Sequence, residues 1–438
     1  MRSILGSVAA LLLSAGILVM GNGLQGTLLP VRAQLEHFST PAIGLMGSFY
    51  FMGFGLGCVL GPQIIKRVGH IRAFAALAAL AAAVPLVHAI FPHPWPWTFL
   101  RTVTGLCFAG LYTVIESWLN ERSTNETRGR ILSLYVVVNL FAIVCGQMLI
   151  GVGHPIGFQL FSLVAILVTL AVVPIALTTA MAPKLPTTVH LRLLRLYSLS
   201  PVGFVGCLIV GITNGAFWTL APAFVTATTG TTDSVAFFMS VAVAGGALLQ
   251  WPLGRLSDRF DRRWVIIVGC LAAAASGICL YLFGPVPLGL YLAAAGFGGT
   301  SLSMYALCVA HANDYVDPAD AVETSSGLLL TFAAGAVVGP FLGSLAMQHL
   351  GHGSLFVYTA CFHLLLAGFA LYRMRRRATL PSDAKEPFVA VEPRLSAQVF
   401  ELDPRAEPSD GGEPAEPAAG GAAGPERDAE GDAAAASH

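Results

Sequence analysis

The sequence predicts an all-α membrane protein with twelve transmembrane helices, arranged as two pseudo-symmetric six-helix bundles. Hydrophobic side chains make up 55% of the 438 residues and charged side chains only 11%, whereas soluble proteins average about 25% charged residues. Apolar runs long enough to cross a bilayer recur along the chain. Lys and Arg gather in alternate connections between these runs, which is typical of a multi-pass membrane protein.

Each span is expected where about 20 apolar residues can cross a hydrocarbon core of about 30 Å. The first run follows Arg2 as in a secretory signal, but Met20-Gly21-Asn22-Gly23 is not a small-x-small cleavage site, so we interpret it as an uncleaved helix. The expected spans are residues 4–30, 41–65, 73–92, 96–119, 131–152, 157–180, 201–226, 234–254, 264–284, 287–311, 324–347 and 353–373.

The placement of basic residues predicts the orientation. With both termini inside, the cytoplasmic segments of residues 1–377 hold eighteen Lys and Arg residues and the opposite side holds only Arg32. Basic loops near helix ends stay on the cytoplasmic side. The sequence therefore predicts a multi-pass protein of the cell (inner) membrane with both termini in the cytoplasm.

Changes in composition divide the chain into four parts. The longest connection between spans, residues 181–200, is a proline-containing cytoplasmic linker between the bundles at 1–180 and 201–377. Residues 378–438 hold 4 basic and 13 acidic groups and are rich in Ala, Gly and Pro. Such a composition does not supply a packed core, so we expect a disordered acidic tail over 378–438.

A short basic turn follows the second span of each half. Pro62-Gln63-Ile64-Ile65-Lys66-Arg67-Val68-Gly69 is matched 192 residues later by Gly254-Arg255-Leu256-Ser257-Asp258-Arg259-Phe260-Asp261. Transporters built from structural repeats show such internal sequence similarity.

The segment Gly254 to Arg263 resembles the loop motif Gly-x-x-x-Asp-Arg-x-Gly-Arg-Arg of the major facilitator superfamily. Arg101-x-x-x-Gly105 resembles that superfamily's arginine motif, and the stretches 250–258 and 115–117 resemble a bacterial branch of mostly uncharacterised transporters. The resemblance implies a secondary active or facilitative carrier of a small solute that works by alternating access.

Two alternatives stay open beside this function: a multidrug or metabolite efflux antiporter, and a non-transporting membrane sensor on the same fold. The fifth span has Gly146-Gln147 without the Gly-Pro step common in drug antiporters, which weakens the first alternative. The first-half loop also departs from the family motif, with Pro62 in place of glycine and Lys66 in place of aspartate.

Arg101 is the only strong base expected inside a span. A charge there costs at least about 2.5 to 3.5 kcal/mol at the bilayer centre. Gly105, Tyr112 and Glu116 share its helix face, which gives this helix one polar stripe. We interpret Arg101 as a cavity cation that binds substrate or couples ions; the alternative is a structural guanidinium that bonds carbonyls or reaches the interface.

Neutral polar and aromatic residues near mid-span are the other candidates for the substrate cavity. They suit a hydroxylated or amphipathic solute, and hydrogen bonding between helices is the alternative role for each. They are Asn22, Gln25, Tyr112, Asn139, Asn214, Trp218, Ser301 and Tyr305.

The candidate gating residues lie at the expected cytoplasmic ends of the helices. Glu116 is the only acid within an expected span and lies near several bases, which favours a gate or a structural salt bridge over a proton carrier. The resemblance implies that Asp258 and Arg259 form a charge network that closes the inward side, with Lys66 and Arg67 as the first-half counterpart. The alternative is that these charges only mark topology.

Two small-xxx-small ladders let helix backbones approach closely. The family fold packs the second and the eleventh helix against each other across the interface between the halves, so we expect these ladders to form a sliding surface there. Packing within one half is the alternative. The ladders are Gly53, Gly57 and Gly61 in the second span and Gly335, Gly339 and Gly343 in the eleventh.

Several function classes lack their signature in this sequence. There is no Gly-x-x-x-x-Gly-Lys-Ser/Thr phosphate loop, and the histidines and eight cysteines show no ligand spacing. We therefore expect no enzyme activity, no cofactor, no metal and no nucleic-acid partner. The expected partners are a small-molecule substrate and membrane lipid, and the expected state is a monomer.

Overall fold

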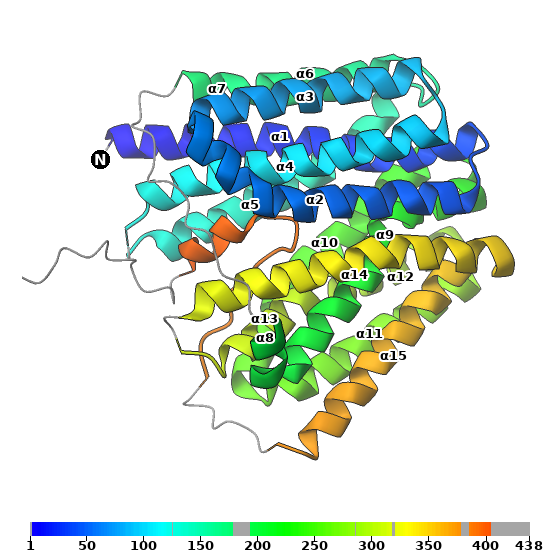
Figure 1. The fold of residues 1–438 in the computed structure, drawn as a ribbon. Helices are drawn as coiled ribbons and strands as arrows, with labels where there is room; N and C mark the ends of the chain where they lie inside the picture. The colour runs from blue at the N-terminus through cyan, green and yellow to red at the C-terminus, as the bar shows by residue number, and fades with distance from the viewer. Residues whose placement is uncertain are drawn as a thin grey trace, which may run out of the picture. The chain divides into compact units, whose positions relative to one another are not determined.

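The described part of the chain contains twelve helices long and apolar enough to cross a membrane, in the order expected from the sequence; Figure 1 shows their arrangement. The computed structural model describes residues 2–124, 126–177, 193–284, 286–317, 320–377 and 385–403, with the backbone alone at 2–7 and 193–194. These residues belong to one compact unit, Met1–Ala406. Every regular element within them is helical, so the predicted all-α class is confirmed.

The first bundle provides six spans. They are α1 (Arg2–Leu35), α2 (Thr40–Val68), α3 (His70–Ile90), α4 (Pro94–Arg122), α5 (Arg128–Met148) with the 3-10 turn η1 (Leu149–Val152), and α6 (Gln159–Leu170) with α7 (Val172–Ala176). Several helices are longer than the apolar runs alone suggest, because polar residues such as Asn120 to Arg122 continue the helix past the end of its apolar run.

The second bundle follows the short helix α8 (Leu193–Leu199), the first described element of the expected linker 181–200. Its spans are α9 (Pro201–Thr229), α10 (Thr232–Arg259), α11 (Arg262–Phe283), α12 (Pro287–Ser301) with α13 (Met304–Asn313), α14 (Ala321–Leu350) and α15 (Ser354–Met374). We call the end at which α1 begins and α15 ends the terminal face, and the other end the distal face.

Local sequence signals fix where several helices begin and end. The hydroxyl of Ser200 accepts a hydrogen bond from the amide of Gly203, and Pro201 occupies the first turn, so α9 begins there. Asp261 caps α11 in the same way by accepting from the amide of Arg263. Gly69 separates α2 from α3 with a φ of 83°, a conformation that a Cβ disfavours.

The two glycine ladders pack inside their own bundles. A Cβ at Gly53 would lie 2.0 Å from the carbonyl oxygen of Thr102 on α4, and one at Gly339 would lie 2.1 Å from that of Ile212 on α9. The other members have the same partners: Gly57 and Gly61 face α4, while Gly335 and Gly343 face α9. The expectation of a sliding surface between the halves is therefore wrong for all six residues, because their missing side chains bring neighbouring helices together within each bundle.

The bundles instead meet through another face of α2, near the distal face. A Cβ at Gly44 would lie 2.2 Å from the hydroxyl of Ser344 on α14, and one at Gly47 would lie 2.1 Å from the hydroxyl of Thr219 on α9. Helices of the two halves thus touch closely at this end. Solute could not pass between them without a rearrangement.

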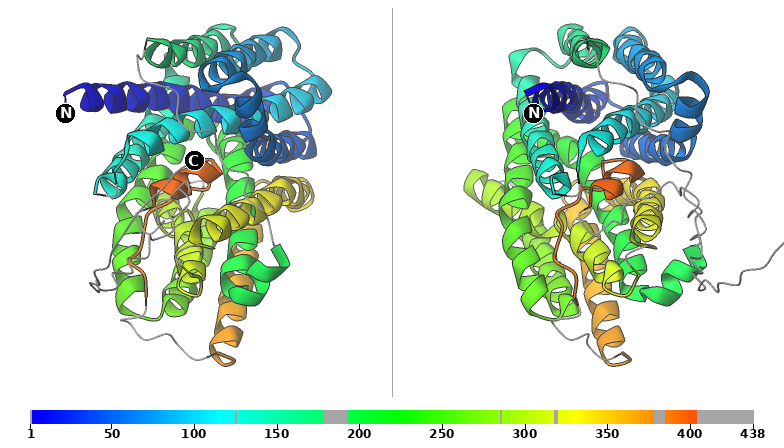
Figure 2. Two further views of the ribbon diagram at one scale, coloured as in Figure 1. Left: turned by 60° about the vertical axis from the view of Figure 1, so that its left-hand side comes forward. Right: turned by 90° about the vertical axis from the view of Figure 1, so that its left-hand side faces the viewer.

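Residues 385–403 lie between the bundles toward the terminal face (Figure 2). An extended stretch leads to the 3-10 turn η4 (Ala397–Leu402), and five apolar side chains of the segment are buried: Val391, Leu395, Val399, Phe400 and Leu402. The structure corrects the expectation of disorder for these residues; 378–384 and 404–438 lie outside the described ranges. Seven large apolar side chains fall within 385–403, a local density that the polar composition of the whole tail conceals.

Candidate functional site

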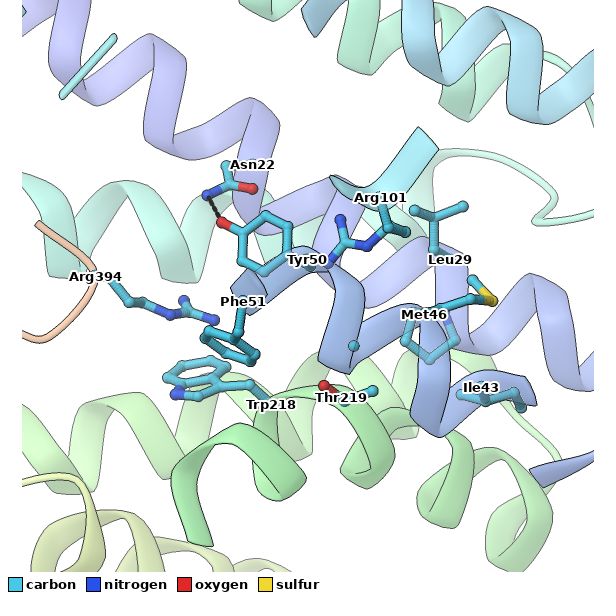
Figure 3. A pocket seen from close by; sticks show the side chains of 13 residues that line it. Asn22, Leu29, Ile43, Met46, Tyr50, Phe51, Arg101, Trp218, Thr219 and Arg394 are labelled. Carbon is cyan, nitrogen blue, oxygen red and sulfur yellow. Dashed lines mark hydrogen bonds between the residues drawn. The ribbon is translucent and has the colours of Figure 1, made fainter. Parts of the chain in front are cut away.

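A polar cavity lies between the two bundles and is bordered by α1, α2, α4 and α9 (Figure 3). Both bundles and the segment 385–403 contribute to its wall. The lining residues are Asn22, Gly26, Leu29, Pro30, Ile43, Met46, Gly47, Tyr50, Phe51, Arg101, Trp218, Thr219 and Arg394. Two of the residues expected from the sequence in one shared cavity, Arg101 and Trp218, thus come from opposite bundles.

Arg101 points into this cavity from α4. The carbon at the centre of its guanidinium lies 4.1 Å from the centroid of the Tyr50 ring. Gly105, one turn later, makes this possible: a Cβ there would lie 2.1 Å from the carbonyl oxygen of Tyr50, so only glycine lets α4 approach α2 so closely. Nη1 of Arg101 is buried and has no hydrogen-bond partner within the described chain. The site therefore offers an unused donor on a buried cation.

Asn22 joins two tyrosines from different helices beside Arg101. Its Nδ2 donates to the hydroxyl of Tyr50 at 3.2 Å and to that of Tyr112 at 3.0 Å. Within the described residues, the two hydroxyls act here as acceptors and neither donates to a further side chain. This cluster supplies neutral polar groups next to the guanidinium, in the arrangement that a ligand with several hydrogen-bonding groups can use.

Two further cavities adjoin the first and share lining residues with it. One is bordered by Asn214, Trp218 and Gln250, the other by Asn22, Tyr112 and Asn139. Both amide atoms of Asn139 are buried without a described partner. Six of the nine residues expected at the substrate cavity therefore line these three neighbouring cavities: Asn22, Arg101, Tyr112, Asn139, Asn214 and Trp218.

The other three expected residues line none of these three cavities. The hydroxyl of Ser301 donates to Oδ1 of Asn214 at 3.0 Å and also contacts Nε2 of His363 at 3.1 Å, which links three helices of the second bundle. The ring of Tyr305 packs edge-on against Phe332. The amide of Gln25 is fully buried, and neither of its polar atoms has a hydrogen-bond partner among the described residues. His363 was missed by sequence reasoning, although its position in the middle of the expected span 353–373 was an available signal, because ionisable residues inside spans face the bundle interior.

Glu116 is buried on α4 between the cavity and the terminal face. Its carboxylate accepts hydrogen bonds from the hydroxyl of Tyr135 at 3.1 Å and from the amide of Ser396 at 3.1 Å, and also from the Ser396 hydroxyl. These partners are neutral. Lys66 and Arg67, the bases expected near it, are exposed at the end of α2.

A charge network at the terminal face centres on Arg262, which sequence reasoning did not single out. Its guanidinium is fully buried; Nε donates to Asp314 at 2.7 Å, and Nη1 lies 3.2 Å from Asp258. Asp258 thus belongs to a network as the family motif implies, whereas Arg259 is exposed. The available signal was the short connection, since Asp258 lies at the end of α10 and Arg262 begins α11.

The segment 385–403 places two further charges in the cavity region. Arg394 lines all three cavities, and its guanidinium carbon lies 3.5 Å from the centroid of the Trp218 ring. Glu392 borders two of them. Burial raises the pKa of the Glu392 carboxyl to about 7, with Arg394 opposing the shift, and burial lowers the pKa of the Arg394 guanidinium.

Comparisons with known proteins identify relatives over most of the chain. The family model for the Major Facilitator Superfamily matches residues 11–201 and 203–408. The uncharacterized MFS-type transporter YcaD of Escherichia coli O17:K52:H18 is 29% identical over 356 residues, which cover 80% of this chain and 92% of that protein.

Solved structures share the fold at low sequence identity. The nucleoside transporter NupG superposes with a TM-score of 0.73 at 12% identity, covering 85% of this chain and all of NupG. A bacterial homologue of the human lysosomal transporter Spinster superposes with a TM-score of 0.70 at 15% identity, covering 84% of this chain and 97% of its own.

Proposed function

The chain belongs to the major facilitator superfamily and is a multi-pass membrane solute transporter, and from this premise we propose that it moves its solute by alternating access through the cavity at Arg101. The observation that carries the proposal is a buried polar cavity whose wall comes from both bundles. Rocking of the bundles about such a cavity exposes it to each side in turn. The close contacts of α2 with the second bundle, at Gly44 and Gly47, support a state that is closed at the distal face.

The terminal face is the cytoplasmic face in this proposal, and the membrane is the inner membrane. The concentration of Lys and Arg at this face supports the orientation. The working unit is one chain, because a single chain supplies every wall of the cavity. Labelling of a cysteine placed at Lys184 in the linker should occur only from the cytoplasm; labelling from outside would reverse the topology.

The solute carries an anionic group that binds Arg101. No Asp or Glu of the described residues forms an ion pair with this guanidinium, and its Nη1 lacks a hydrogen-bond partner there. A buried cation without a counter-ion is unfavourable, and a ligand carboxylate or phosphate would relieve that cost. Tyr50 and Trp218 add aromatic surface, so an amphipathic organic anion fits the wall better than an inorganic ion.

A ligand-stabilisation screen on purified protein tests the solute class. Small organic anions and their neutral amide or ester analogues are compared in matched pairs, and a bound ligand raises the apparent unfolding temperature. We expect stabilisation by at least one anion and none by its neutral partner. Equal stabilisation by both members of every active pair would remove Arg101 from solute recognition.

Uptake of the selected anion into proteoliposomes then separates a carrier from a sensor. A carrier accumulates or equilibrates the anion inside the vesicles and shows counterflow when the vesicles are preloaded with it. Binding without uptake or counterflow would contradict transport by this chain.

A further inference from the structure

Residues 385–403 occupy the space between the bundles that lies on the terminal side of the cavity. Residues 385–403, drawn in red-orange in Figure 2, run between helices of both halves. At the distal end the halves touch each other directly, whereas at this end the segment lies between them. It contacts the second bundle first, then the cavity, and its last turn η4 contacts α4 and α5 of the first bundle as well as α14 of the second.

The second bundle holds the start of the segment. The ring of Phe388 lies against Gly254, where a Cβ would come within 2.2 Å of a ring carbon. The amide of Phe388 donates to Asp258 at 3.0 Å, and the carbonyl of Glu386 accepts from the buried guanidinium of Arg262. Residues Gly254 to Arg263, which resemble the family's loop motif, therefore form the binding surface for the start of this segment.

The middle of the segment fills the mouth of the solute cavity. Glu392 and Arg394 border the cavities, and Arg394 stacks on Trp218. Trp218 is also part of the wall that faces Arg101 (Figure 3). A solute that enters from the terminal face would have to displace these two side chains.

The first bundle holds the end of the segment. The amide and hydroxyl of Ser396 both donate to the buried carboxylate of Glu116. Beyond it, Val399, Phe400 and Leu402 are buried, and Nδ2 of Asn120 donates to Glu401. Glu116 thus obtains two of its hydrogen-bond donors from a part of the chain that is 280 residues away.

We propose that the opening between the bundles is a docking site for the chain's own residues 385–403, which exclude solute from the cavity and hold the two bundles apart at the terminal face until the segment is released. The proposal rests on the transport function proposed above. Alternating access requires the terminal ends of the bundles to approach each other, and a peptide anchored to Asp258 on one side and Glu116 on the other opposes that approach. Docking and solute entry are therefore mutually exclusive.

Trypsin cleavage after Arg394 measures docking in the full-length protein without any knowledge of the solute. The docked bond between Arg394 and Leu395 is enclosed by the bundles, so cleavage reports the released fraction. Ser396→Ala removes the hydroxyl bond to Glu116, and Phe388→Ala removes the ring on Gly254. We expect each to accelerate cleavage by roughly tenfold, the effect of losing one anchoring contact of this kind.

The matched control is Arg376→Ala, which removes an exposed guanidinium that stacks on Tyr372 at the same face. It should cleave after Arg394 at the wild-type rate. Rapid cleavage of the wild type, or equal rates in the wild type and both anchor variants, would overturn the docking proposal.

Uptake of the anion selected by the screen tests the inhibitory consequence. Ser396→Ala and Phe388→Ala should raise the initial uptake rate per folded molecule at least severalfold, and a synthetic peptide of residues 385–403 added at the terminal face should lower it again. Unchanged or lower uptake in protein whose tail is released would overturn inhibition. If no variant transports while the cleavage rates differ as expected, the transport proposal fails and the docking site stands.

Discussion

Arg394 stacks on Trp218 with 3.5 Å between its guanidinium carbon and the ring centroid, which joins the chain's last described segment to the second bundle. The same tryptophan borders the cavity that contains Arg101. A cation over an indole face contributes about 0.5 to 2 kcal/mol, more when water is excluded. One contact thus couples the tail to the candidate solute site.

Arg394→Ala should make Trp218 accessible from water. Without the guanidinium, the indole face is open to the cavity, so quenching of tryptophan fluorescence by acrylamide should increase. The increase must vanish in the Trp218→Phe background, which keeps the five other tryptophans. Equal quenching with and without the arginine would show that Arg394 does not cover Trp218 in solution.

Docking of residues 385–403 should weaken as the pH rises through 7. A free glutamate titrates near about 4.3, whereas burial raises the pKa of docked Glu392 to about 7 against the opposing effect of Arg394. The docked state therefore binds the proton more tightly, so its stabilisation is complete below the free pKa and is lost as the pH rises through the docked pKa.

Quenching of Trp218 should accordingly be greater at pH 8 than at pH 5.5. Glu392→Gln removes the titrating group and should flatten the difference. Tyr112, Asn139 and Arg394 border the same cavity and are unchanged in this variant. A pH dependence that persists in Glu392→Gln belongs to another group.

Asp314→Asn should destabilise the folded protein more than Asp258→Asn. Both carboxylates contact Arg262, but the side chain of Asp314 is 3% exposed and that of Asp258 is 38% exposed. Removing a partner from a buried charge costs about 3 to 5 kcal/mol, while a partly exposed pair contributes about 1 kcal/mol or less. Thermal unfolding of the purified variants shows which one loses more stability. Equal decreases in unfolding temperature would contradict the prediction.

Gly53→Ala should lower the amount of folded protein, whereas Gly55→Ala should be tolerated. The new Cβ at Gly53 would lie 2.0 Å from the backbone oxygen of Thr102, which cannot move without separating α2 from α4. At Gly55 the nearest atom is 3.8 Å away, an ordinary contact. Size-exclusion profiles of the two variants make the comparison, and similar yields would refute the close α2–α4 packing.

The sequence predicted the positions of the spans well, because a long apolar run marks each of the twelve spans and the basic loops between them support the same assignment. The position of Arg101 at a cavity was also predicted, because a charged side chain in an apolar helix has few favourable positions. The glycine ladders were assigned to the wrong neighbours because spacing shows that a helix has a smooth face but not which helix packs there. Residues 385–403 were missed because average composition hid a short apolar stretch, and Arg262 because its partner Asp314 lies 52 residues away.

Anion binding and uptake by Arg101 variants test the transport mechanism most directly. With equal amounts of folded protein, Arg101→Lys keeps the charge but loses the planar two-point geometry. If Arg101 holds the anionic group of the solute, Arg101→Lys should weaken binding by about tenfold or more, and Arg101→Ala should abolish saturable uptake. Unchanged affinity and uptake in both variants would contradict a solute site at Arg101.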